Sequence, residues 1–291
     1  MEPIASIIVP SYNSEKYIGQ TIKFLQAQEL KDIEIIVVDD CSKDGTCDVV
    51  VACDDPRIRC YRLKKRHGGP SVPRSVGVAL SRAPYVAFCD SDDLLMPKML
   101  SEAVRFIKEH DEVGLCFFNA IKFDDQTGAE QPPFLSAYKY FRNIPKTKAK
   151  EDWFIMAPPR AYFGLFYENF ILTPGCVVVR KQVFEEVGNF DRTLKNADDW
   201  DMWLRISKKY PIGYIDHIGL RYRVRNASVS GRGASLHFNR IKVLNKHLES
   251  NCPKNVILKI RTLIAENFVS AGYAYQRSFK FTEAKKYYLK S

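Results

Sequence analysis

In the first 112 residues, short apolar runs alternate with stretches in which apolar residues recur every three or four positions. The apolar runs cover 5–13, 33–40, 58–63 and 85–90. The helical spacing appears at 14–29, 48–52, 72–83 and 97–110. Continuously apolar strands separated by helices are typical of a parallel sheet covered on both faces. The pattern predicts an α/β fold with a Rossmann-like, mostly parallel central sheet flanked by helices.

From residue 113 the pattern is less regular. Apolar or alternating runs predict strands at 113–124, 175–181 and 212–224, and an amphipathic pattern predicts a helix at 198–210. Between them, 125–172 is rich in proline, lysine and aromatic residues and shows little periodicity. Long segments without periodicity are uncommon in compact domains unless they have a function. We therefore expect a long excursion over the surface or the active site.

The tail from about residue 235 has a helical pattern. Four of its residues, Gly272, Tyr275, Ala284 and Tyr288, are spaced like positions of a tetratricopeptide repeat. An independent array normally needs three or more repeats. Two interpretations stay open: the repeat belongs to a longer array, or the helices form a hairpin that packs on the preceding domain. We favour the helical cap.

Composition indicates an ordinary globular protein, with 46% hydrophobic and 27% charged residues. No stretch of about 18 uncharged apolar residues predicts a membrane-spanning helix, and the first ten residues do not read as a signal peptide. The eight cysteines are scattered, with no CxxC pair and no histidine at zinc-site spacing. We expect buried free thiols, Cys89, Cys116 and Cys176 among them, and a cytoplasmic location.

The net charge of +10 favours anionic partners. Basic residues cluster at 62–69, 146–150 and 221–225, but none of these clusters has the aromatic interleaving of a nucleic-acid module. No nucleic-acid partner is therefore predicted. Taken alone, each cluster is most simply solvated surface, and so is His67 within the first.

Carboxylates gather where two of the predicted strands end. One predicted strand ends in Asp39 and Asp40, and another ends in Asp90, with Asp92 and Asp93 directly after it. In a doubly wound sheet, ligands bind at the carboxyl ends of the strands. A divalent cation, Mg²⁺ or Mn²⁺, would offset the repulsion between these groups and hold a diphosphate. The alternative is a capped turn, with Asp92 or Asp93 at the start of the following helix.

These motifs resemble those of the family-2 glycosyltransferases, which have the GT-A fold. The match consists of VPSYN, VVDDCSKDGT, the helix with Arg74, FCDSDD, GCVVVRKQVFEEVGNFDRTL, DDWDMWLRI and RYRVRNASVS, in the family's order and spacing. It covers roughly residues 3–230. The resemblance implies a GT-A domain at 1–230, with a nucleotide-sugar-binding half at 1–112 and an acceptor-side half at 113–230. A helical C-terminal extension at 231–291 would follow.

The resemblance also implies roles on the nucleotide side. Pro10, Tyr12 and Asn13 would lie under the base and ribose. Asp39 would contact the base or the ribose edge, with Asp40 beside it.

The diphosphate and the metal would be held by a second group of residues. Arg74 would approach the diphosphate or ribose, although Ser75 follows it where the family commonly has Asn. Asp90 and Asp92 form the D-x-D element. Asp92 is the first choice for the metal ligand, while Asp90 is the second choice and would also contact ribose. Asp93 would assist at the metal or cap the helix.

The acceptor side carries the expected base. Asp198 and Asp199 stand where the family usually has Glu-Asp, and we assign the base to Asp199, with Asp198 as second choice. A helix start lowers a carboxyl pKa, so we expect the base to be ionised at neutral pH. A purely structural reading is that acidic residues favour a helix N-terminus. Arg223 would reach the leaving diphosphate, and Arg225 stands where His is common; solvated edge charges are the alternative.

The implied activity is metal-dependent, inverting transfer of a sugar from a nucleoside-diphosphate sugar, with a UDP-sugar favoured. The acceptor would be a glycan or a lipid-linked hydroxyl in bacterial cell-surface polysaccharide or glycolipid synthesis. The family suggests peripheral association with the inner face of the plasma membrane, which the charge permits. A sugar nucleotidyltransferase would need a glycine-rich phosphate loop, which VPSYNSEKY lacks. A non-catalytic scaffold fits the repeat-like tail but not the intact carboxylates. Donor sugar and oligomeric state stay open.

Overall fold

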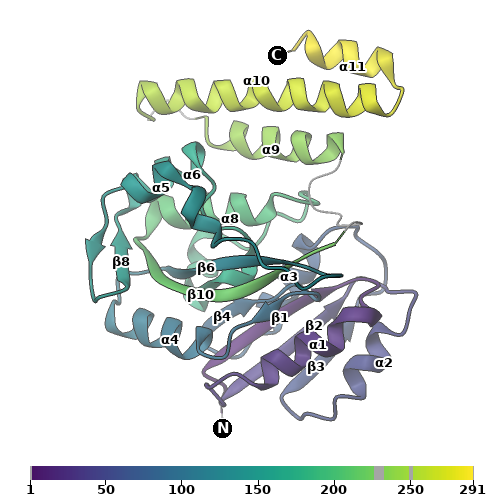
Figure 1. Cartoon of the computed structure of the whole chain (residues 1–291), viewed down its shortest axis with the longest axis vertical. Helices are drawn as coiled ribbons and strands as arrows, with labels where there is room; N and C mark the ends of the chain where they lie inside the picture. The colour runs from purple at the N-terminus through teal and green to yellow at the C-terminus, as the bar shows by residue number, and fades with distance from the viewer. Residues whose placement is uncertain (1, 226–232, 249–251, 291) are drawn as a thin grey trace.

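The computed structural model describes residues 2–225, 233–248 and 252–290. It consists of one mixed sheet with helices on both faces and a stack of helices beyond it (Figure 1). The strands follow the order β3-β2-β1-β4-β9-β6-β10-β8-β7, and β5 pairs with β10 off this path. The predicted boundary between 1–230 and 231–291 lies outside the described residues.

The first half is the predicted parallel arrangement. Its strands are β1 (Ala5–Ser11), β2 (Ile33–Asp39), β3 (Ile58–Arg62) and β4 (Tyr85–Phe88), and all three pairings among them are parallel. Its helices are α1 (Glu15–Gln26), α2 (Thr46–Val51), α3 (Ser71–Leu80) and α4 (Met99–Glu109). Every residue of β1 and β2 is buried, because helices cover both faces of the sheet.

The second half adds antiparallel strands. β9 (Val177–Arg180) runs antiparallel between β4 and β6 (Leu115–Asp124), and β10 (Ile212–Val224) continues parallel to β6. The short β5 (Leu94–Leu95) pairs antiparallel with β10. The turn η2 (Pro174–Cys176) leads into β9, and the helices α7 (Lys181–Val187) and α8 (Asp198–Lys209) follow it.

The segment 125–172 is more regular than its sequence predicts. It forms η1 (Phe134–Ala137), α5 (Lys139–Asn143), β7 (Thr147–Lys148), β8 (Trp153–Met156) and α6 (Pro158–Tyr167). β8 pairs with β10, so the segment extends the sheet. Aromatic packing explains why periodicity failed: the Phe141 ring lies 4.9 Å from that of Phe170 and 5.1 Å from that of Tyr214.

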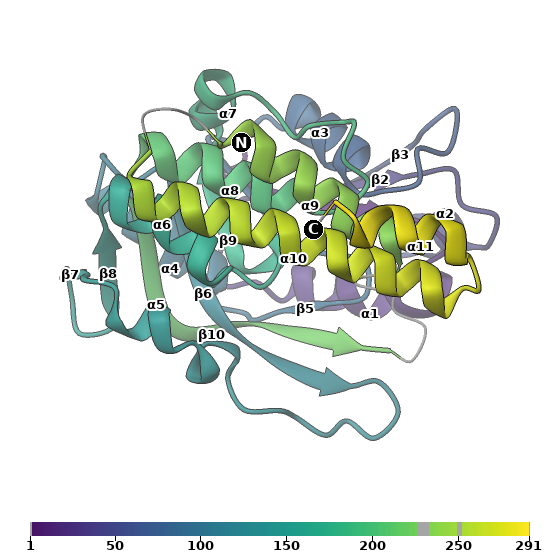
Figure 2. The ribbon, with the colours of Figure 1, turned by 90° about the horizontal axis from the view of Figure 1, so that it is seen from above.

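The C-terminal extension consists of α9 (Ala234–Lys246), α10 (Lys254–Arg277) and α11 (Phe281–Tyr288). Figures 1 and 2 show α9 between the sheet-containing part and α10, with α11 folded back along the end of α10. A Cβ on Gly272 would lie 2.7 Å from the Tyr288 ring, so glycine permits this close approach. The predicted helical hairpin is therefore present.

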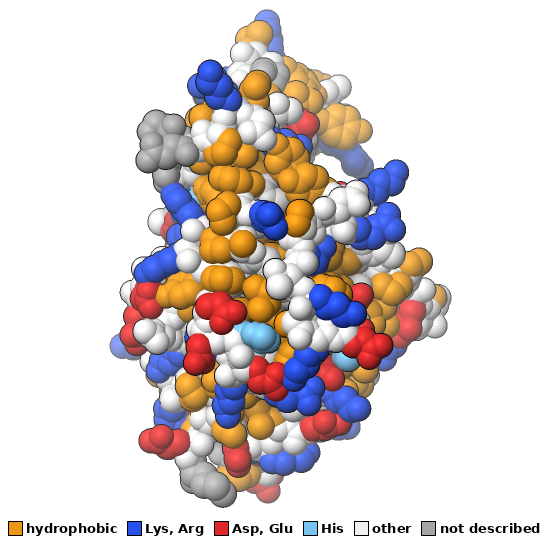
Figure 3. Space-filling view, turned by 90° about the vertical axis from the view of Figure 1, so that its left-hand side faces the viewer, with side chains coloured by type: hydrophobic (Ala, Val, Ile, Leu, Met, Phe, Trp, Pro, Cys, Tyr) orange, Lys and Arg blue, Asp and Glu red, His pale blue; other side chains and the backbone are white. Residues whose placement is uncertain are grey.

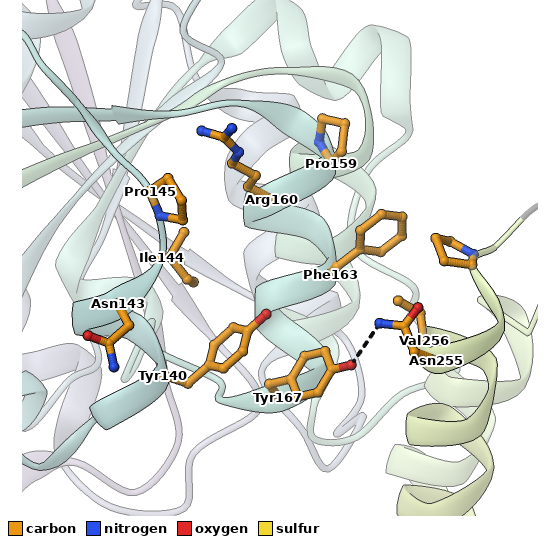
Figure 4. A pocket seen from close by; sticks show the side chains of 11 residues that line it. Tyr140, Asn143, Ile144, Pro145, Pro159, Arg160, Phe163, Tyr167, Asn255 and Val256 are labelled. Atoms are coloured by element: carbon orange, nitrogen blue, oxygen red, sulfur yellow. Dashed lines mark hydrogen bonds between the residues drawn. The ribbon is translucent and has the colours of Figure 1, made fainter.

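The extension is seated on the sheet-containing part around a pocket of about 290 Å³ (Figure 4). α5, α6 and the start of α10 line it, chiefly with aromatic and proline side chains. The Tyr140 and Tyr167 rings stack at 4.6 Å, and Asn255 Nδ2 donates to the Tyr167 hydroxyl at 3.3 Å. None of the predicted site residues lines this pocket.

Three of the eight cysteines, Cys89, Cys116 and Cys176, are buried thiols as expected. Within the described part of the chain, no helix is both long and apolar enough to cross a membrane.

The packing of α3 on β1 leaves no room for a side chain at Gly77, whose Cβ would lie 2.3 Å from Ile8 Cγ2. We predict that Gly77→Val lowers the free energy of unfolding by about 2–3 kcal/mol, because overpacking displaces α3. Urea denaturation measures this. The matched control is Gly45→Ala, where the new Cβ meets only the flexible end of Glu15. Equal stability of the two variants would contradict the packing argument.

Candidate active site

The site forms where the carboxyl ends of β1, β2 and β4 meet the start of α8. Because these strands are parallel, their ends share one edge of the sheet. The residues after β4 and those opening α8 are far apart in sequence. A single arginine brings them together.

Arg74, on α3, is 4% exposed and bridges the two groups. Its Nη1 donates to Asp198 Oδ2 at 2.9 Å, and its Nη2 donates to Asp90 Oδ1 at 2.8 Å. Burial opposes the charge on Arg74, but the two carboxylates outweigh burial and raise its pKa. The predicted donor-side and acceptor-side residues are thus held by one guanidinium.

The pKa values at the start of α8 differ from expectation. Burial raises the pKa of Asp198 to about 6, although Arg74 attracts the charged form; the charge of Asp199 adds to the rise. Burial also raises the pKa of Asp199. The expected lowering by the helix start was wrong, because the loss of solvent outweighs the helix dipole here. Asp199 Oδ1 accepts the Trp200 N–H at 2.8 Å, and its side chain is partly exposed.

The D-x-D element makes several contacts. Besides Arg74, Asp90 accepts a hydrogen bond from Thr173 Oγ1 at 3.3 Å. Asp92 Oδ2 lies 2.6 Å from Arg225 Nη2. Asp93 is fully buried and does not cap α4; its Oδ1 accepts the Arg223 N–H at 2.9 Å.

These carboxylates are crowded. Burial and the charges of its neighbours raise the pKa of Asp93 well above its usual range, and burial raises that of Asp92. Asp93 Oδ2 is buried with no hydrogen-bond partner among the described residues. Such an orphaned oxygen in a negative cluster fits a nearby cation. No group of three or more candidate protein ligands gathers in the described residues. One or two carboxylates together with substrate phosphates are a common ligand set for Mg²⁺.

Arg223 lies beside the D-x-D element. The side chain is buried; Nη1 donates to Asp125 at 2.8 Å, Nη2 to Gln20 at 2.6 Å and Nε to the Asp92 carbonyl at 2.7 Å. Through its Nε, this arginine fixes the Asp92 backbone. Arg225, further along the chain, is 31% exposed and reaches the Asp92 carboxylate.

Both acidic residues at the end of β2 are engaged. Asp39 is fully buried and accepts hydrogen bonds from the Ser42 N–H at 2.9 Å and from the Ser42 hydroxyl. Asp40 accepts the backbone N–H groups of His67 and Gly68 at 2.8 and 2.9 Å. The His67 ring also lies 3.0 Å from Asp40, so His67 is not simply solvated. Asp40 therefore holds the loop that precedes α3.

The residues expected under the base lie around the end of β1. Pro10 is buried within that strand, and Asn13 Oδ1 accepts the Lys43 N–H at 2.8 Å. The Arg66 guanidinium stacks on the Tyr12 ring, 4.1 Å from its centroid. Aromatic rings and guanidinium planes are surfaces on which other rings commonly stack.

Sequence reasoning missed two contributors. Arg66 belongs to a basic cluster that we interpreted as solvated surface. Only its position close to the carboxyl ends of the strands could have identified it. Thr173 follows the aperiodic segment, and no sequence signal marks it.

The family model described as Glycosyl transferase family 2 matches residues 6–188. The chain belongs to glycosyltransferase family 2.

Among relatives of this family-2 chain, an uncharacterized glycosyltransferase of Rickettsia typhi is 28% identical over 78% of this chain and 66% of its own length. TarS of Staphylococcus aureus, a poly(ribitol-phosphate) β-N-acetylglucosaminyltransferase, is 39% identical over 36% of this chain and 19% of TarS. The putative teichuronic acid biosynthesis glycosyltransferase TuaG of Bacillus subtilis is 28% identical over 79% and 82%. The chain thus spans about two thirds of the Rickettsia relative and a fifth of TarS.

Solved structures share the fold. TarS 1–349 in complex with UDP-GlcNAc superposes with a TM-score of 0.66 at 19% identity, covering 99% of this chain and 90% of that one. The mannosyltransferase PcManGT of Pyrobaculum calidifontis, in complex with GDP-Man and Mn²⁺, gives 0.60 at 18% identity, over 99% and 74%. The family-2 chain therefore has the expected GT-A fold.

The raised pKa of Asp198 makes stability depend on pH. In the folded chain its carboxyl keeps a proton up to about pH 6, whereas an unfolded aspartate releases it near pH 3.9. We predict that wild type loses about 2 kcal/mol relative to Asp198→Asn as pH rises from 4 to 7. Urea denaturation across this range tests the prediction, with the exposed Asp48→Asn as control. A pH-independent difference would show an ordinary pKa for Asp198.

Proposed function

We propose that this chain is an inverting glycosyltransferase that moves a sugar from a nucleoside-diphosphate sugar to an acceptor hydroxyl. The carrying observation is the Arg74 bridge, which joins Asp90 after β4 to Asp198 at the start of α8. It brings a donor-side carboxylate and a candidate base into one site. Family membership supports the reaction class.

In this proposal Asp199 accepts the proton of the acceptor hydroxyl as its oxygen attacks the anomeric carbon. The bond between that carbon and the diphosphate oxygen breaks on the opposite face, and the nucleoside diphosphate leaves with the electron pair. Arg74 and Arg225 supply positive charge beside the leaving group. A base needs a pKa near the working pH, and the raised pKa of Asp199 moves it in that direction.

Asp92 and Asp90 are the residues that would hold Mn²⁺ or Mg²⁺. When bound, the ion neutralises charge on the departing diphosphate. Asp93 Oδ2, which is buried with no hydrogen-bond partner among the described residues, supports a cation beside Asp92. PcManGT, similar in fold, was solved with Mn²⁺.

Donor and acceptor classes complete the proposal. A UDP-sugar is favoured because the fold matches TarS in complex with UDP-GlcNAc, although PcManGT holds GDP-Man. TarS and TuaG are named for poly(ribitol-phosphate) and teichuronic acid chemistry. By analogy, the acceptor is a glycan or lipid-linked hydroxyl in cell-surface polysaccharide or glycolipid synthesis, at the inner face of the plasma membrane.

The first test is the thermal midpoint with UDP, GDP, dTDP or CDP, each with Mn²⁺, Mg²⁺ or EDTA. A ligand that binds the folded state raises the midpoint as ln(1 + [L]/Kd). We expect a shift with one nucleotide, UDP, that requires a divalent cation. No shift with any nucleotide would overturn the donor site, and an equal shift in EDTA would overturn the metal assignment.

The base assignment makes a separate prediction. Asp199→Asn leaves the midpoint shift with the donor nucleotide unchanged but lowers the transfer rate by about 10²–10⁴-fold, because a general base is lost. Release of nucleoside diphosphate from the donor measures the rate, and Asp48→Asn on α2 is the control. Unimpaired transfer would rule out Asp199. If the wild-type protein binds nucleotide but shows no turnover, the alternative of a non-catalytic scaffold protein would be favoured.

Arg225 competes with a cation for Asp92. The exposed ion pair is worth about 1 kcal/mol, so Arg225→Gln should raise the affinity of the nucleotide-free protein for Mn²⁺ about fivefold. Electron paramagnetic resonance of free Mn²⁺ measures the affinity. The control is Arg221→Gln on the same strand, whose arginine pairs with Glu130 instead. Equal affinities in all three proteins would show that Asp92 is not the ligand.

A further inference from the structure

The charge of this chain is divided unevenly along its length. Residues 231–291 contain 12 Lys and Arg against three Asp and Glu, which is +9 of the total of +10. Residues 1–230 contain 32 against 31 and are nearly neutral. The basic character therefore belongs to the C-terminal extension and not to the site.

Large apolar side chains are exposed at the outer end of this extension. Phe279 is 83% exposed, Phe281 60% and Leu289 79%. The two phenylalanine rings contact edge-on at 6.4 Å, so they form one patch at the turn between α10 and α11. α11 is the layer farthest from the sheet (Figure 1). Exposed apolar clusters of this kind mark interaction sites.

The packing of α11 fixes which side faces outward. Ala284 is buried, and the Tyr287 ring stacks on Tyr275 at 5.5 Å. Phe281, Lys285 and Leu289 are four residues apart in turn and so follow one side of the helix.

Lysines surround the apolar side chains. Lys280, Lys285, Lys286 and Lys290 are all exposed, and Glu283 is the one acidic residue between 279 and 290. Figure 3 views the molecule from the side opposite the turn between α10 and α11; the near face of the C-terminal helices shows hydrophobic and basic side chains with few acidic ones. Lower down, acidic and basic side chains alternate.

We propose that this end of the extension docks on a bilayer of anionic lipids. Aromatic and aliphatic side chains would enter the interface while lysines contact the head groups, as in interfacial helices. This proposal rests on the membrane location given in the proposed function and assigns a surface to it. Docking on the bilayer does not depend on the sugar-transfer reaction.

Two other occupants fit the surface less well. A soluble polyanion would pair with the lysines but leave Phe279, Phe281 and Leu289 in water. A second copy of this chain would bury those residues but would bring two sets of lysines together, at a cost in repulsion. The bilayer satisfies both the charge and the apolar groups.

The test is co-sedimentation of the full chain with vesicles of phosphatidylcholine alone or mixed with phosphatidylglycerol. We expect binding only to the anionic vesicles, weakened by salt. Both Phe279→Ser/Phe281→Ser/Leu289→Ser and Lys285→Gln/Lys286→Gln/Lys290→Gln should lower partitioning more than tenfold. The matched control, Lys108→Gln/Lys139→Gln/Lys148→Gln, removes three exposed lysines from the sheet-containing part and should bind like wild type.

Each contrary result has a clear meaning. Unchanged binding of the serine variant would overturn insertion of the apolar side chains into the bilayer. It would indicate a purely electrostatic contact of the lysines, as with a soluble polyanion. Equal binding to both vesicle types, none to either, or weakened binding of the control would overturn the surface assigned here. Light scattering without vesicles identifies a dimer lost in the serine variant, which would assign the surface to a second copy. Nucleotide-dependent midpoint shifts, measured on the same variants, report separately on the donor site.

Discussion

The site depends on one buried guanidinium. Arg74 lies on α3 and contacts carboxylates from both halves of the chain. Removing one partner of a buried ion pair typically costs about 3–5 kcal/mol, because the remaining charge is left without compensation. α3 must therefore lie close to β1, and the absence of a side chain at Gly77 permits this close packing. α8 must also begin within reach of the Arg74 side chain. Several features of the fold serve this contact.

Around Arg74 the balance of charge is negative. Asp90, Asp92, Asp93, Asp198 and Asp199 are set against the three arginines of the site, Arg74, Arg223 and Arg225, and four of these five carboxyls have raised pKa values. Two of the arginines hold positions: Arg74 joins the halves, and Arg223 fixes the Asp92 backbone. Arg225 is the most exposed of the three. A substrate complex with a bound cation would complete this arrangement of charge.

The sequence predicts the first half well, since buried parallel strands and amphipathic helices have distinct periods. It also predicts that Asp39, Asp40 and Asp90 lie at the carboxyl ends of strands. It could not predict the contacts of Arg223, because the partners of its guanidinium, Asp125 and Gln20, lie far from it in the sequence. The predicted lowering of the carboxyl pKa at the start of α8 was wrong for a similar reason. The helix start can be recognised from local sequence, whereas the burial that raises the pKa of Asp198 depends on other elements. The elements in 125–172 arise from aromatic contacts that have no period.

The position of β9 has a consequence for how the chain acquires its fold. This strand, at 177–180, lies between β4, at 85–88, and β6. During synthesis, β4 leaves the ribosome long before its neighbour on that side exists. The nascent chain therefore carries an open strand edge, which is a template for pairing with other chains. Contacts so distant in sequence also slow folding. The acidic residues just after β4 provide charge beside that edge until β9 has been synthesised and pairs with it.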